Sequence, residues 1–302
     1  GIWESVLQDN VTVNINFNFS ALPPGVLGET NSQTIGASFS GVKAALALDI
    51  TSTNDVLAVT NLPGGTSMNF LTNDDSTGAP FFDNDGSSNN TVLDITRANA
   101  KALGLLGANN TATDAAIAFS STFAFDFDAS NGLAGFDFVG IAAHEIGHTL
   151  GFVSGVDIVD ITSGNGPFAP FDLSTFRVFS VLDLFRYSSN SLAQGPGVFD
   201  FSTGGTPFFS VNGGATNLAT FSTGQFNGDG RQASHWKDNL GLGIMDPTAA
   251  SGEFLQVSTL DQLAFDAIGW DFRTSTPVPL PSTLLLILIG IVSSSIIFLR
   301  SR

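Results

Sequence analysis

The sequence predicts an α+β fold in which an N-terminal part with a mixed sheet leads into one helix, and an irregular C-terminal part follows. Two segments, 11–19 and 115–127, alternate apolar and polar residues with a period of two, which is typical of half-buried strands. Residues 136–152, FDFVGIAAHEIGHTLGF, predict a helix that ends near Gly151. The chain has 302 residues, 43% of them hydrophobic, so it can bury a sizeable core.

Local signals predict the remaining elements. Proline and glycine clusters indicate loops, runs of Ala and Leu favour helix, and a Ser or Thr followed three positions later by an acidic residue forms a capping box at a helix start. Thr91 with Asp94 and Ser258 with Asp261 form two such boxes. In chain order we expect a loop over 21–28, a helix over 40–49, a strand over 57–62, a polar loop over 72–91, a helix over 92–103, a helix over 173–187, short strands over 199–221 and a helix over 258–268.

Charge and cysteine content exclude several classes of protein. The formal net charge is −17, from 10 basic and 27 acidic residues, and such a surface repels the phosphate backbone of nucleic acids. The absence of cysteine excludes disulfides and thiolate metal sites. Asp83, Asp85 and Asp94 lie in a polar segment at a spacing similar to that of a calcium loop, so Ca²⁺ is a candidate cofactor, with a solvated acidic surface as the alternative.

Residues 144–148 read HEIGH, which places His144 and His148 four positions apart. On a helix such residues share one face, so both imidazoles can reach one zinc ion. Glu145 lies beside them, where a carboxylate can deprotonate a water that zinc activates and can pass the proton to a leaving amine. Histidines that merely pack in a core are the alternative. Because the whole chain has only 3 His, chance explains this spacing poorly.

A catalytic zinc takes a third protein ligand and keeps one position open. The motif continues to HExxHxxG, and the residue three positions further on is Ser154, whose neutral hydroxyl is a poor ligand. Asp157 and Asp160 are nearby carboxylates and are alternative metal ligands. The remaining histidine, His235, stands in SHWK, and IMDP follows ten positions later.

The combination of HEIGHTLGF, a long insert, SHWK and IMDP resembles the leishmanolysin-type metzincin zinc metallopeptidases. This resemblance implies that His144, His148 and His235 are the zinc ligands. It also implies that Glu145 is the general base and that Met245 is the residue of the Met-turn beneath the metal. The fold it implies is metzincin-like, with a cleft between the two parts that binds an extended peptide.

The resemblance is specific over 136–155 and 233–248 and implies a division of the chain. The expected parts are a catalytic domain over 1–272, a linker over 273–282 and a tail over 283–302. Within the catalytic domain we expect the zinc helix at 136–152, an insert at 155–232, and the third ligand with the Met-turn at 233–248.

The tail differs in kind from the rest of the chain. Residues 283–299 carry no charge, are mostly Leu, Ile and Val, and are followed by Arg300 and Arg302, which is typical of a short membrane span. Together with VPLPST ahead of it, this segment is similar to a PEP-CTERM sorting tail, and its pairing with the HExxH body resembles a PEP-CTERM-associated metalloprotease family of bacteria. The resemblance implies export from a Gram-negative cell, and an exosortase-like partner or a membrane anchor.

The first residue is Gly1 and no signal-peptide pattern precedes it, so we expect a processed or trimmed chain whose start is missing. The predicted function is an exported zinc endopeptidase that cleaves protein or peptide substrates, and the acidic surface favours neutral or basic peptides. The alternative is a non-catalytic surface or matrix-binding protein that zinc or calcium stabilises.

Overall fold

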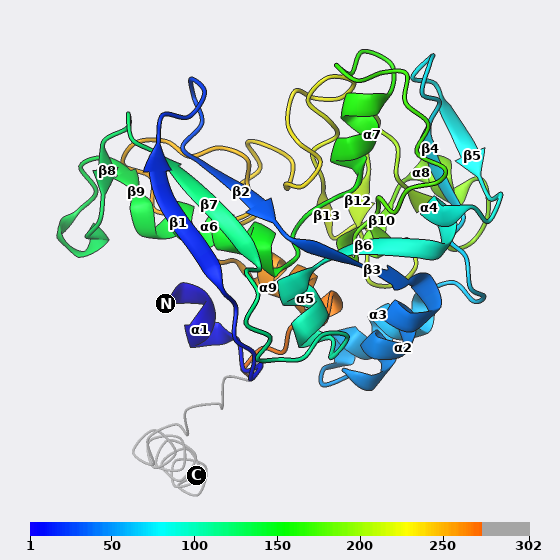
Figure 1. Ribbon diagram of the computed structural model, residues 1–302, viewed down its shortest axis with the longest axis horizontal. Helices are drawn as coiled ribbons and strands as arrows, with labels where there is room; N and C mark the ends of the chain where they lie inside the picture. The colour runs from blue at the N-terminus through cyan, green and yellow to red at the C-terminus, as the bar shows by residue number, and fades with distance from the viewer. Residues whose placement is uncertain (274–302) are drawn as a thin grey trace, which may run out of the picture. The chain divides into compact units, whose positions relative to one another are not determined.

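In the computed structural model, which describes residues 1–273, two strands from the start of the chain and a third from near residue 115 form a mixed sheet (Figure 1). The central strand is β7 (Ala115–Ser120), with β1 (Ile15–Ser20) parallel to it on one side and β2 (Gly28–Ser32) antiparallel on the other. The α+β class and the mixed sheet are therefore as predicted. Because β2 pairs only with β7, its outer edge is unpaired within the described sheets.

The helix with the HEIGH motif is α6 (Phe138–Leu150), which packs on one face of this sheet. Asp137 caps its start by accepting a hydrogen bond from the N–H of Gly140, and Gly151 ends it with a φ of 122°. Ile117 and Phe119 of β7 pack against Ile141, because the apolar residues of the alternating strand face the helix. This packing fixes α6 beneath β2.

The rest of the described chain surrounds this unit with short elements. β3 pairs with β6, β11 with β4 and β4 with β5, β12 with β10 and with β13, and β8 with β9. The remaining bounds are α1 Ile2–Val6, β3 Thr34–Ser38, α2 Phe39–Leu48, α3 Thr53–Asn61, β4 Phe70–Asn73, β5 Pro80–Asp83, α4 Ser88–Thr91, β6 Val92–Thr96, α5 Arg97–Ala102, β8 Phe125–Asp126, η1 Ala129–Asn131, β9 Phe136–Asp137, α7 Val156–Thr162, η2 Leu182–Phe185, β10 Arg186–Tyr187, α8 Ser189–Leu192, β11 Phe199–Asp200, β12 Phe208–Phe209, β13 Ala219–Thr220 and α9 Thr259–Ala267.

Several predicted elements are confirmed, and four are wrong. The helices near 40–49, 136–152 and 258–268 and the short strands over 199–221 form where the sequence predicts them. The predicted strand over 57–62 is helix α3, the first half of the predicted helix over 92–103 is strand β6, the loop over 72–91 contains β5 and α4, and 173–187 is irregular apart from η2 and β10.

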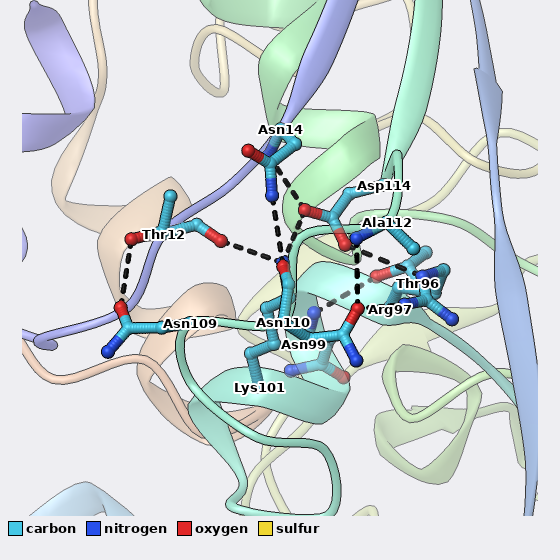
Figure 2. A network of polar contacts seen from close by, with 10 residues as sticks. All are labelled: Thr12, Asn14, Thr96, Arg97, Asn99, Lys101, Asn109, Asn110, Ala112 and Asp114. Atoms are coloured by element: carbon cyan, nitrogen blue, oxygen red, sulfur yellow. Dashed lines mark hydrogen bonds and ion pairs between the residues drawn. The ribbon is translucent and has the colours of Figure 1, made fainter.

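A buried polar network joins the first residues of the chain to α5 and to the segment before β7 (Figure 2). The ammonium of Lys101 is fully buried and donates to Asp114 at 2.6 Å, to the carbonyl of Thr12 at 2.7 Å and to the carbonyl of Asn110 at 3.0 Å. Each of the three ammonium protons thus has an acceptor, and these hydrogen bonds offset the free-energy cost of burying the charge. The network holds the segment before β1 beside the segment before β7.

The predicted tail lies almost wholly outside the described residues. The linker and tail expected over 273–282 and 283–302 fall beyond the described chain from residue 274 on, so their sorting role stays a prediction. Over residues 1–273, no helix combines the length and the apolar character that a bilayer crossing requires.

Candidate metal centre

The three histidines of the chain meet at one point. His144 and His148 come from α6, and His235 comes from the loop after β13. One ring nitrogen of each lies within 4.8 Å of the others, and the Nε2 atoms of His144 and His148 are 3.1 Å apart. No other group of three or more His, Asp or Glu side chains within residues 1–273 converges in this way, so this group is the one that could hold a metal ion.

Each imidazole turns its Nδ1 toward a backbone carbonyl oxygen. The pairs are His144 with Ile244 at 2.7 Å, His148 with Phe152 at 2.7 Å and His235 with Gln232 at 3.2 Å. Because a carbonyl oxygen only accepts, Nδ1 must carry the hydrogen, and the lone pair of each neutral ring is then on Nε2. Histidines that bind metals in proteins are commonly oriented by such a contact on the other nitrogen.

The surroundings favour neutral rings. Burial, with a smaller effect from the neighbouring His144, lowers the pKa of His148 to about 3. Burial also lowers the pKa of His235 well below its usual value, as do the two other histidines. A neutral imidazole is the form that binds a metal, so these two rings are in a form that could bind one near pH 7.

Glu145 lies beneath strand β2 and is almost fully buried. Its Oε2 accepts a hydrogen bond of 2.7 Å from the hydroxyl of Thr30, and burial raises its pKa. Strand β2 can approach the side chain of Glu145 closely because residue 28 is glycine. A Cβ at this position would lie 2.6 Å from Oε1 of Glu145. Neither Thr30 nor Gly28 carries any signal in the sequence that links it to the HEIGH motif.

Met245 lies directly against α6, with its side chain fully buried. A Cβ at Gly147 would come within 2.5 Å of the Met245 sulfur, so the glycine inside HEIGH gives the methionine its space. The loop that carries Met245 is held from α9, where the carboxylate of Asp261 accepts from Nε1 of Trp236 and from the N–H of Ile244, both at 2.8 Å. The sequence predicts Asp261 as a capping residue but not this second role.

The alternative ligands lie outside the histidine group. Asp157 accepts hydrogen bonds from the N–H groups of Ala233 at 2.5 Å and of Ser234 at 3.2 Å, directly ahead of His235. Ser154 donates its hydroxyl to the buried Asp183 at 2.6 Å. The acidic residues near the motif therefore hold backbone segments in the structure.

The proposed calcium loop does not form as predicted. Asp94 lies in strand β6 and pairs with Arg177 at 2.6 Å. Asp83 accepts the side-chain amide of Asn90 at 3.1 Å. Asp83, Asp85 and Asp94 do not gather into a metal-binding group in the described part of the chain. The spacing failed because the last of them belongs to a strand rather than to a loop.

A cavity of about 730 Å³ adjoins the site. Its lining includes residues 29–32 of β2, residues 116–118 of β7 and residues 153–155 after α6. The histidines do not line it, but two of its lining residues are connected to the site. Thr30 donates to Glu145, and the N–H of Ser154 donates to the hydroxyl of Ser234, next to His235.

Compared with family models, with curated proteins and with solved structures, the chain matches none of them. A functional assignment therefore rests on the arrangement of its own residues.

Proposed function

We propose that this chain is a zinc-dependent endopeptidase of the metzincin kind. The observation that supports it best is the convergence of three histidines, each with its Nδ1 on a backbone carbonyl and its Nε2 left for a metal, beside the buried carboxylate of Glu145. Three imidazoles with an open position suit catalytic zinc, whereas structural zinc sites are closed by a fourth ligand. Met245 beneath α6 and the turn at Gly151 agree with the metzincin resemblance.

In this proposal Glu145 acts as the general base. Zinc, when bound by the three Nε2 atoms, supplies a Lewis acid that polarises a carbonyl and makes water more acidic. The carboxylate of Glu145 takes a proton from the attacking water and returns it to the leaving amine as the peptide bond breaks. Thr30 orients that carboxylate through its hydrogen bond to Oε2.

The substrate we propose is an extended peptide that lies along the unpaired edge of β2. An edge strand offers free N–H and C=O groups, and a peptide can pair with them as an added strand. The charged residues that line the adjoining cavity are Glu29 and Asp94, and Asp94 is paired with Arg177. Glu29 is thus the uncompensated charge of the lining, which favours neutral or basic peptides.

The test is the Glu145→Gln substitution in the full chain. Gln keeps the size of the side chain but cannot take a proton, so we expect casein hydrolysis to fall by at least about 100-fold. Zinc content, measured by mass spectrometry, should equal that of the wild type because Glu145 is not a ligand. Glu253→Gln, which changes an exposed glutamate of the 250–253 turn, is the matched control and should leave both unchanged.

Three results would contradict this function. If the purified wild-type protein contained no zinc, the proposed metal site would be wrong. If the wild type binds zinc and the Glu145→Gln variant hydrolyses casein equally fast, Glu145 is not the general base. A wild type that holds zinc, cleaves nothing and loses stability when zinc is removed would favour the non-catalytic surface protein instead.

A further inference from the structure

The start and the end of the segment between α6 and His235 are joined by side chains of α7. Asp157, in the first turn of α7, accepts hydrogen bonds from the N–H groups of Ala233 and Ser234 and from the hydroxyl of Ser234. The hydroxyl of Ser234 in turn accepts from the N–H of Ser154 at 2.8 Å. We call these three residues, Ser154, Asp157 and Ser234, the insert clamp.

The two serines of the clamp are buried, Asp157 is partly buried, and further hydrogen bonds support Ser154. Ser154 donates its hydroxyl to Asp183, and the other oxygen of Asp183 accepts from the N–H groups of Gly155 and Ser180, both at 2.8 Å. Burial raises the pKa of both Asp157 and Asp183, and their hydrogen bonds and the nearby buried guanidinium of Arg186 act in the opposite direction. The contacts are therefore held in one arrangement by several independent bonds.

The three histidines differ in how their positions are set. His144 and His148 are placed by helix α6, and each has a 2.7 Å contact from Nδ1 to a carbonyl. His235 lies on a loop, and its Nδ1 contact is longer, at 3.2 Å. The residue directly before it, Ser234, is a member of the clamp. The position of His235 therefore depends on the clamp far more than the positions of the other two do.

We propose that Asp157 is a positioning residue that holds the third histidine in register with the first two. This inference rests on the proposed metal site, and it gives Asp157 a role other than that of a ligand. A carboxylate with two oxygens can accept from two backbone N–H groups and a hydroxyl at once, which an amide of the same shape cannot do. Groups that orient metal ligands typically change metal affinity by 10- to 100-fold when removed.

The same helix supplies a matched control. Asp160, also buried on α7, accepts from the N–H groups of Gln225, Phe226 and Asn227 at 2.6, 2.9 and 2.8 Å. It thus fastens an earlier part of the same loop, residues 225–227, to α7 by the same kind of bonds, and that part contains no histidine. A general loss of insert stability should follow from either substitution, whereas loss of metal geometry should follow only from a change at Asp157.

The experiment compares Asp157→Asn and Asp160→Asn in the full chain. The readouts are the Kd for zinc, the visible absorption spectrum of the cobalt-substituted protein, the Tm of the metal-free protein and casein hydrolysis. For Asp157→Asn we expect a zinc Kd at least about tenfold weaker and a changed cobalt spectrum. For Asp160→Asn we expect the wild-type Kd and spectrum, with a lower Tm.

Ser234→Ala decides the case if Asp157→Asn does not fold. It removes the hydroxyl contacts and keeps the backbone bonds to Asp157, so we expect a smaller loss of zinc affinity in the same direction. Wild-type affinity and spectrum in the folded Asp157→Asn or Ser234→Ala protein, or equal losses in Asp160→Asn, would overturn the inference. Failure of the proposed function is distinguishable, because the wild type itself would then lack zinc or casein activity.

Discussion

At the scale of single residues, the hydrogen bond from Thr30 to Glu145 connects the strand along the cavity to the predicted base. Thr30→Val removes the donor at nearly constant volume. A hydrogen bond to a charged group contributes about 1.5–3 kcal/mol, so we expect kcat on casein to fall by roughly tenfold or more, with unchanged zinc content. Thr34→Val is the control, because Thr34 lines the same cavity and makes no hydrogen bond to Glu145. An equal loss in both variants would remove the special role of Thr30.

The HEIGH motif could be found from the sequence because the contacts within it follow from the helix period alone. The partners of the histidines could not be found in this way. Ile244 accepts from His144 across 100 positions of the chain, through a backbone carbonyl that any residue type would supply. Asp157 was visible near the motif, but only the path of the chain back to Ser234 shows which atoms its carboxylate binds.

At the scale of elements, two predictions failed for different physical reasons. Residues 92–96 follow a Thr91–Asp94 pattern that resembles a capping box, yet they form β6, because pairing with β3 buries Leu93 and Ile95. The strand predicted over 57–62 is instead part of a helix. The real capping box there is Ser52 with Asp55, and it starts helix α3. A weak local pattern thus gave way to strand pairing in the first case and to a stronger local signal in the second.

Helix α9 shows how one element can organise the site from a distance. Asp261 is fully buried and accepts from Trp236, Ile244 and the N–H of Ser258. Asp261→Asn would leave buried N–H groups unsatisfied, at about 1–3 kcal/mol each. We expect a drop of at least about 3 kcal/mol in the free energy of unfolding, measured by urea denaturation, and weaker zinc binding.

Asp55→Asn is the matched control for that prediction. Asp55 holds the same third position in the capping box of α3, but its carboxylate binds only Thr51 and Ser52. The expected loss is about 1 kcal/mol, with zinc binding unchanged. If Asp261→Asn lowered the free energy of unfolding no more than Asp55→Asn does, the hydrogen bonds from Asp261 to the Met245 loop would not contribute to stability.

At the scale of the whole molecule, four of the many acidic residues come from distant parts of the chain and lie close together. Asp9, Asp49, Asp266 and Asp271 lie near one another, since each of the first three is affected by the charge of Asp271. Burial is the main cause of the shifts, and it raises the pKa of Asp49 to about 7 and that of Asp9 and Asp266 to about 6.

These shifts predict a pH-dependent stability. The folded chain holds these protons more tightly than the unfolded chain does. The stability that the protonated carboxyl groups contribute is therefore fully present below about pH 4. It is lost as the pH rises through about 6 to 7. We therefore expect Asp49→Asn to raise Tm relative to the wild type at about pH 8 and to change it little at about pH 4.5. Thermal unfolding by circular dichroism at both pH values checks this, and a Tm difference that does not depend on pH would contradict it.

The insert clamp joins residues that are 80 positions apart, in a chain without cysteine. Exported proteins often close such spans with a disulfide, which reducing agents open and oxidants restore. Here the same closure is made by a carboxylate, two serines and backbone amides. No covalent cross-link exists for the redox state of the surroundings to make or break, so the distance between the third histidine and its partners stays the same in oxidising and in reducing media.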